Sequence, residues 1–136
     1  MQTKFALTLA DARRIAEAAE AKARESGWNV VIAIVDDGGH LMLLQRLDGT
    51  QPASSEIATA KARTAALFKR PTKALEEAVA SGRTAMLALP GLTPVEGGAP
   101  ILYRGELVGA IGVSGVQSFQ DGIVAAAGAA IVAEDS

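Results

Sequence analysis

The sequence contains one histidine, and charged side chains follow it at even spacing. Arg46 and Asp48 lie six and eight positions after His40. Successive side chains on a β-strand point to opposite faces, so a strand from His40 to about Leu47 would place Met42 and Arg46 on the face of the histidine. Asp48 continues this face. Histidine changes charge near neutral pH, and arginine can bind a carboxylate through two parallel hydrogen bonds. This face is therefore a candidate site for proton transfer or for binding a small acidic molecule.

The same residues also have structural interpretations. The stretch Asp36-Asp37-Gly38-Gly39 before the histidine favours a tight hairpin reversal. His40 could therefore follow a turn and hydrogen-bond to one of these aspartates. Arg46 could form an ion pair with Asp48, two residues along the same face. Both interpretations stand beside the functional one.

Lys61 lies in the next predicted helix, which is capped by Ser54 or Ser55 and ends near Lys69. On a helical wheel it falls near the middle of the inward face. Either its stem packs and its ammonium reaches the rim, or the charge faces a polar pocket, because an unpaired buried ammonium is costly. In a pocket, Lys61 would be a candidate catalytic or carboxylate-binding residue. The other residues of the inward face are Ile57, Ala60, Thr64 and Phe68.

Glycine-containing segments supply a further candidate binding site. Gly97-Gly98 and Ser114-Gly115 offer backbone N–H groups, and a predicted helix beginning near Ser118 adds the positive end of its dipole. An anion could bind there, although glycines at hairpin ends commonly serve turns. We interpret Ser118 and Asp121 as a helix cap.

The remaining pattern predicts an α+β fold in a single domain covering residues 1–136. A first helix is predicted from the N-cap Thr8 to about Ser26. Two hairpins are predicted, one around 36–39 and one around Arg104-Gly105. They imply a central, largely antiparallel sheet of four or five strands covered by about four helices.

Composition and charge argue against several classes of function. The 136 residues carry a net charge of −2 without a basic block, so nucleic acid binding is not expected. The apolar runs are short and broken, which argues against a membrane span. The N-terminal stretch lacks the apolar core and cleavage site of a signal peptide, so we expect a cytoplasmic protein. Cysteine is absent, which excludes thiolate chemistry, and a single histidine disfavours a transition-metal centre built from protein ligands alone.

Several strings along the chain together resemble one family. They are Val35-Asp36-Asp37-Gly38-Gly39-His40, Arg46-Leu47-Asp48-Gly49, Lys61-Ala62-Arg63-Thr64-Ala65, Phe68-Lys69-Arg70-Pro71-Thr72, Gly97-Gly98-Ala99-Pro100 and Gly109-Ala110-Ile111-Gly112-Val113-Ser114-Gly115. In this order they resemble the GlcG/HbpS family, whose domain also forms the C-terminal part of PduO-type proteins. The resemblance covers nearly the whole chain. It implies a compact domain with a central antiparallel sheet, usually assembled into a homo-oligomer. Some members bind haem, with one branch tied to redox sensing or iron release, and others accompany glycolate, propanediol or aromatic-compound catabolism.

The leading hypothesis is a small-molecule-binding protein that works as a homo-oligomer and binds haem or a related tetrapyrrole. His40 would ligate the haem iron or donate a proton, and Arg46 and Lys61 would hold carboxylates. The lesser candidates for the iron ligand are Tyr103, Met42 and Lys61. The remaining predicted ligand-binding residues are Asp48, Gly97, Gly98 and Ser114.

Two alternatives accompany this hypothesis. In the first, the chain is an enzyme or accessory protein of small organic acid catabolism. Arg46 and Lys61 would then bind the substrate carboxylate, and His40 would transfer a proton. In the second, the chain is a scaffold. Gly109 and Gly112 would then serve only subunit packing, because glycine in a strand lets another backbone approach closely.

Overall fold

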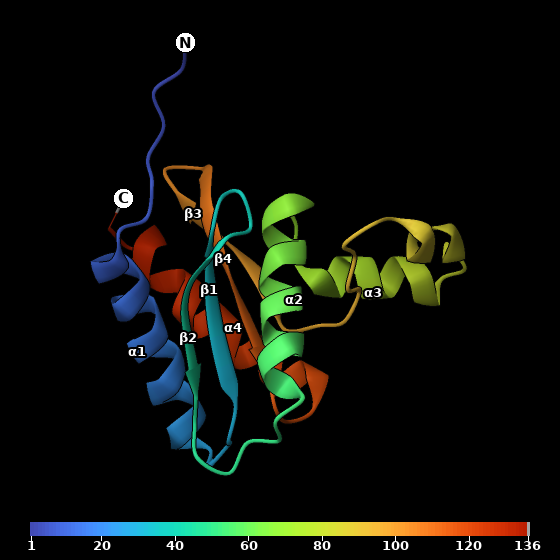
Figure 1. Ribbon diagram of the computed structural model, residues 1–136, viewed down its shortest axis with the longest axis horizontal. Helices are drawn as coiled ribbons and strands as arrows, with labels where there is room; N and C mark the ends of the chain where they lie inside the picture. Colours follow the sequence, from blue (N-terminus) through green and yellow to red (C-terminus); the bar gives the residue numbers. More distant parts are fainter. Residues whose placement is uncertain (136) are drawn as a thin grey trace.

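The computed structural model describes residues 1–135, which form a four-stranded antiparallel sheet and the helices that cover it (Figure 1). The elements in chain order are α1 (Leu9–Glu25), β1 (Val31–Asp36), β2 (Leu41–Arg46), α2 (Ser54–Leu67), α3 (Thr72–Ala80), the 3₁₀ helix η1 (Thr84–Ala88), β3 (Gly98–Tyr103), β4 (Glu106–Ser114) and α4 (Ser118–Ala133). The strand order is β2-β1-β4-β3, so each hairpin supplies one central strand and one edge strand. The predicted α+β fold is confirmed, with four strands.

Helices α1 and α4 cover one face of the sheet and enclose the main hydrophobic core (Figure 1). Ile32, Ile34 and Ile111 point to this face and are fully buried. Helix α1 begins at the predicted N-cap Thr8, whose side chain and backbone form a capping box with Asp11. Its inward stripe consists mostly of alanine, which lets the helix lie close to the sheet. The buried residues of this stripe are Ala12, Ile15, Ala16, Ala19 and Ala23.

Helix α2 covers the opposite face, and Gly112 lets it lie directly on β4. A Cβ atom at Gly112 would stand 2.0 Å from the carbonyl oxygen of Ala58 and 2.5 Å from the amide nitrogen of Ala62. At Gly109, a Cβ atom would stand 2.4 Å from the carbonyl oxygen of Val35. Both glycines therefore serve close packing within the chain, which gives them a role that needs no second subunit.

The starts of α2 and α4 differ from the predicted caps. Ser54 and Ser118 are the first helical residues, and the residue before each of them is the N-cap. The Ser54 hydroxyl instead accepts a hydrogen bond from the Ser114 hydroxyl at 3.1 Å, because β4 passes beside the start of α2. At α4, Gln117 and Gln120 form the capping box in place of Ser118.

A bulge in the first hairpin changes the direction of Met42. The register of β1 against β2 shifts between Ile34 and Val35, which leaves Met42 as the extra residue of β2. Met42 consequently packs against the main core beside Leu43. The prediction that Met42 and His40 share a face is therefore wrong, because the alternation of side chains between the two faces stops at the bulge.

Helix α3 and η1 project beyond α2, away from the sheet (Figure 1). Their buried side chains are Thr72 and Leu75 in α3 and Met86 in η1. Within residues 1–135, none of the helices combines the length and apolar character needed to cross a bilayer.

Candidate functional site

His40 lies at the end of the turn that joins β1 to β2. Its Nδ1 atom lies 3.1 Å and 3.2 Å from the two carboxylate oxygens of Asp36. The backbone N–H groups of Gly38 and His40 donate to the same carboxylate, each at 2.9 Å. The His40 side chain is 82% exposed, so the aspartate orients the ring without burying it.

These hydrogen bonds set the pKa of Asp36 and the tautomer of the neutral His40 ring. Partial burial raises the pKa of Asp36, but the N–H groups of His40 and Gly38 and the nearby imidazole outweigh it and hold that pKa below its ordinary value. An ionised carboxylate only accepts hydrogen bonds, so Nδ1 of the His40 ring carries the hydrogen that faces Asp36. In the neutral ring, Nε2 is then left with a free lone pair. His40 is thus arranged to bind a metal ion through Nε2 or to accept a proton there.

Arg46 and Asp48 lie far from this histidine. Arg46 pairs with Val31 at one end of the hairpin, whereas His40 precedes the residue that pairs with Val35 at the other end. Six steps of extended strand separate His40 from Arg46 by about 20 Å. Both charged side chains are exposed, and within residues 1–135 they form no ion pair with each other. The organic-acid hypothesis placed His40 and Arg46 in one site, and the structure does not bring these two residues together.

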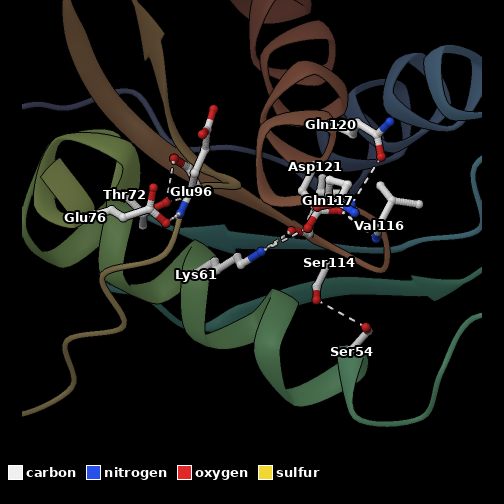
Figure 2. A network of polar contacts seen from close by, with 12 residues as sticks. Ser54, Lys61, Thr72, Glu76, Glu96, Ser114, Val116, Gln117, Gln120 and Asp121 are labelled. Carbon is white, nitrogen blue, oxygen red and sulfur yellow. Dashed lines mark hydrogen bonds and ion pairs between the residues drawn. The ribbon is translucent and has the colours of Figure 1, made fainter. Parts of the chain in front are cut away.

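Lys61 points into the contact between α2, β4 and α4 (Figure 2). It is 2% exposed, which agrees with its predicted position on the inward face. Its Nζ donates to the carbonyl oxygen of Val113 at 3.0 Å and to Oδ2 of Asp121 at 3.2 Å. The other carboxylate oxygen of Asp121 accepts the backbone N–H of Val116 at 3.2 Å. One buried ion pair therefore joins three elements of the fold.

The electrostatics of this pair are dominated by its burial. Removal from water raises the pKa of Asp121 above its ordinary value, more than the positive charge of Lys61 and the N–H of Val116 lower it. The carboxylate of Glu96 adds to the upward shift. The two side chains are 2% and 3% exposed, so a ligand could reach the ammonium only after the surrounding loop had moved. With both side chains buried, the ion pair of Lys61 and Asp121 stabilises the contact between α2, β4 and α4.

Gly97 leaves the space that the ammonium occupies. Its φ is +130°, a conformation that favours glycine. A Cβ atom at this position would stand 2.8 Å from Nζ of Lys61 and 2.6 Å from the carbonyl oxygen of Val113. A side chain here would therefore push the lysine out of its place.

Gly98 and Ser114 belong to the same buried region. The N–H of Gly98 donates to Oγ1 of Thr72 at 2.8 Å, so an anion at this glycine would compete with an existing hydrogen bond. The Ser114 hydroxyl is engaged with Ser54. The predicted site residues that the structure gathers in this region are Lys61, Gly97, Gly98 and Ser114. Their predicted role in ligand binding remains a prediction.

Asp121 is the residue of this region whose role the sequence interpretation missed, because it was assigned to a helix cap. A signal for it exists in the sequence. A lysine on an inward face needs a buried acceptor. Asp121 is the acidic residue of the first turn of α4, directly before that helix's apolar run.

Tyr103 borders a small cavity between the N-terminal segment and the second hairpin. The cavity measures about 250 Å³ and also borders Leu7, Val108 and Val132. The ring of Tyr103 packs edge-on against Phe5, with ring centroids 4.7 Å apart. Ligand pockets typically measure about 300–1,000 Å³, so this cavity does not enclose a ligand as large as haem.

The residues at the first hairpin fit haem in their donor chemistry. An imidazole nitrogen is a common axial ligand of haem iron, and His40 offers a free Nε2. Exposed apolar side chains flank the turn: Leu41 is 52% exposed and Leu67 is 46% exposed. Leu67 lies against Gly39, with its Cγ 3.3 Å from where a Cβ of that glycine would be. Among the described residues, no three or more His, Cys, Asp or Glu side chains lie close enough together to hold a metal ion by themselves.

Comparisons with known proteins identify the family. A family model described as "Haem degrading protein HbpS-like" matches residues 7–130. Protein GlcG of Escherichia coli (strain K12) is 46% identical over 114 residues, which are 84% of this chain and 85% of that protein. The crystal structure of HbpS has a TM-score of 0.89 at 34% identity, over 97% of this chain and 94% of that one. The crystal structure of a PduOC–haem complex has a TM-score of 0.84 at 29% identity, over 93% of this chain and 94% of that one. The chain therefore belongs to the HbpS-like family, as its sequence strings predicted.

Proposed function

We propose that this chain binds haem as a homo-oligomer, in which His40 would hold the haem iron. The observation that carries the proposal is the contact between Nδ1 of His40 and the carboxylate of Asp36. A carboxylate in this position fixes the tautomer of a ligating histidine and raises the basicity of its other nitrogen. Bound haem would supply redox chemistry at its iron, and the chain would hold and orient it.

The comparisons support the same ligand. One similar structure is a PduOC–haem complex, and the matching family model is described by haem degradation. Haem binding by this chain is proposed from that similarity and from the donor chemistry of His40 at the first hairpin turn. The organic-acid hypothesis has no comparable support, because His40 and Arg46 lie at opposite ends of β2.

Exposure of the turn favours binding in an assembly. A porphyrin placed against His40 would contact Leu41 and Leu67 on one chain, and both are about half exposed. The rest of its apolar surface would face water, and burial of such surface contributes about 25 cal/mol per Å². A second chain that covered this surface would strengthen binding, which links the proposed ligand to the proposed homo-oligomer.

Titration of the purified chain with haemin tests the proposal. We expect a Soret band that differs from that of free haemin and saturates at a fixed ratio of haem to chain. Absence of any saturable change would refute haem binding. Thermal stabilisation by a small carboxylate without a Soret change would instead support the organic-acid hypothesis.

A further inference from the structure

A groove on the outer side of α2 presents a charge pattern that is complementary to itself. The groove measures about 360 Å³ and lies between α2 and the edge strand β2. Glu56 stands at one end of its helical wall and Arg63 at the other, with Thr59 and Ala60 between them. The charged residues are seven positions apart, which is about two helical turns or 10.5 Å, so they share one side of the helix.

The two charged side chains of the groove have no oppositely charged partner among the described residues. Within residues 1–135, Glu56 and Arg63 take part in no ion pair, and both are exposed. Their separation along the helix is too large for a direct contact between them. Two opposite charges at the ends of one groove are therefore both available to a partner.

The middle of the groove allows close approach. Ala60 has a minimal side chain, and the hydroxyl of Thr59 donates to the carbonyl oxygen of Ser55 at 2.9 Å, which leaves its methyl group free to pack. Leu44 of β2 lies in the same groove and is 39% exposed. Helices with small residues at their contact can approach to about 8 Å between axes.

We propose that this groove is an interface for a second copy of the same chain, whose α2 lies antiparallel to the first across a two-fold axis. The axis would pass between Thr59 and Ala60, since these two residues lie midway between the charged ends. Such an isologous contact places Glu56 of each chain against Arg63 of the other, so both ion pairs form at once. Leu44 of each chain adds apolar contact beside the axis.

The inference deepens the homo-oligomeric part of the proposed function and rests on it, but it does not depend on haem. The groove lies along α2 and β2, and His40 lies at the turn before β2. Self-association can therefore be measured without haemin, and a failure of haem binding would leave the interface standing.

Sedimentation of charge variants tests the interface in haem-free protein. Glu56→Arg and Arg63→Glu each place like charges against one another at two symmetric contacts. Each is expected to weaken the dimer about tenfold or more. The double variant Glu56→Arg/Arg63→Glu restores both pairs in reversed order and is expected to recover association. Circular dichroism confirms that the helices of each variant are intact.

Matched controls come from the exposed face of α1. Glu17→Arg and Arg13→Glu make the same changes of net charge on exposed residues outside the groove, and are expected to leave association unchanged. A monomeric wild-type chain would overturn the inference. An assembly whose dissociation constant is unaffected by the single reversals, or is not recovered by the double variant, would also overturn it.

Discussion

At the scale of single residues, exposure separates the two polar sites. His40 and Asp36 form a hydrogen-bonded pair that a ligand can reach, whereas Lys61 and Asp121 form a pair closed to solvent. The inward direction of Lys61 could be predicted from helical spacing. Its partner could not, because residues sixty positions apart meet only once the sheet has formed.

Replacement of Asp36 by Asn tests the exposed pair through its pH dependence. The pKa of Asp36 is lowered in the folded chain, so its carboxylate stabilises the fold above its unfolded pKa of about 4 and loses this effect as the pH falls through the lowered value. We expect Asp36→Asn to cost less than about 1 kcal/mol at pH 7, since the side chain is partly exposed. The difference between urea midpoints should close below about pH 4. A difference that is equally large at pH 3 would contradict this assignment.

Replacement of Lys61 by Met tests the buried pair. The variant leaves the carboxylate of Asp121 buried without a cation, a change that typically costs about 3–5 kcal/mol. Loss of the lysine removes a charge that lowers the pKa of Asp121, so the folded variant takes up a proton more readily. The deficit should therefore be larger at pH 8 than at pH 5, as measured by denaturant unfolding.

The second substitution Asp121→Asn should recover part of this loss, because it removes the unpaired charge and keeps an oxygen for the N–H of Val116. Lys73→Met, at an exposed lysine of α3, is the control and should change stability by no more than about 0.5 kcal/mol. A Lys61→Met variant as stable as this control at pH 8 would show that the ion pair of Lys61 and Asp121 does not stabilise the fold.

At the scale of elements, patterns in the chain predicted the first helix and both hairpins. The alanine stripe of α1 packs on the main core, and the apolar run of β1 is buried on both faces of the sheet. The direction of Met42 was wrong because a bulge interrupts the alternation. The predicted cap role of a serine at the start of α2 was also wrong, because the Ser54 hydroxyl is engaged by Ser114 of β4, a tertiary contact that local pattern does not contain.

The contact of α2 with β4 predicts a large effect of Gly112→Ala. The added Cβ would overlap the backbone of α2 at Ala58 and Ala62, so the helix would have to move as a unit. We expect a loss of about 3 kcal/mol or more in thermal or denaturant unfolding. Gly105→Ala is the control: Gly105 has a φ of +78° but no neighbouring atom within 4 Å, so only about 1–2 kcal/mol should be lost. Equal losses in the two variants would exclude backbone packing as the role of Gly112.

At the scale of the whole molecule, the family and fold could be predicted from ordered sequence strings, but a shared site could not. His40, Arg46 and Lys61 are each placed by local pattern, and their mutual distances depend on strand register and helix packing. The structure assigns them to three different places. The homo-oligomer and the cytoplasmic location expected from sequence remain predictions.

Binding of haem iron by His40, with Asp36 orienting the ring, can be measured by titrating haemin into the wild-type chain and three variants. Wild-type chain should give a saturable Soret change, and His40→Ala should abolish or markedly shift it. Asp36→Asn should retain binding with about 10–100-fold lower affinity, because the ring loses its orienting carboxylate. Arg46→Ala, about 20 Å away along β2, should titrate like wild type. A His40→Ala variant whose titration and spectrum match those of the wild-type chain would contradict binding of the haem iron by His40.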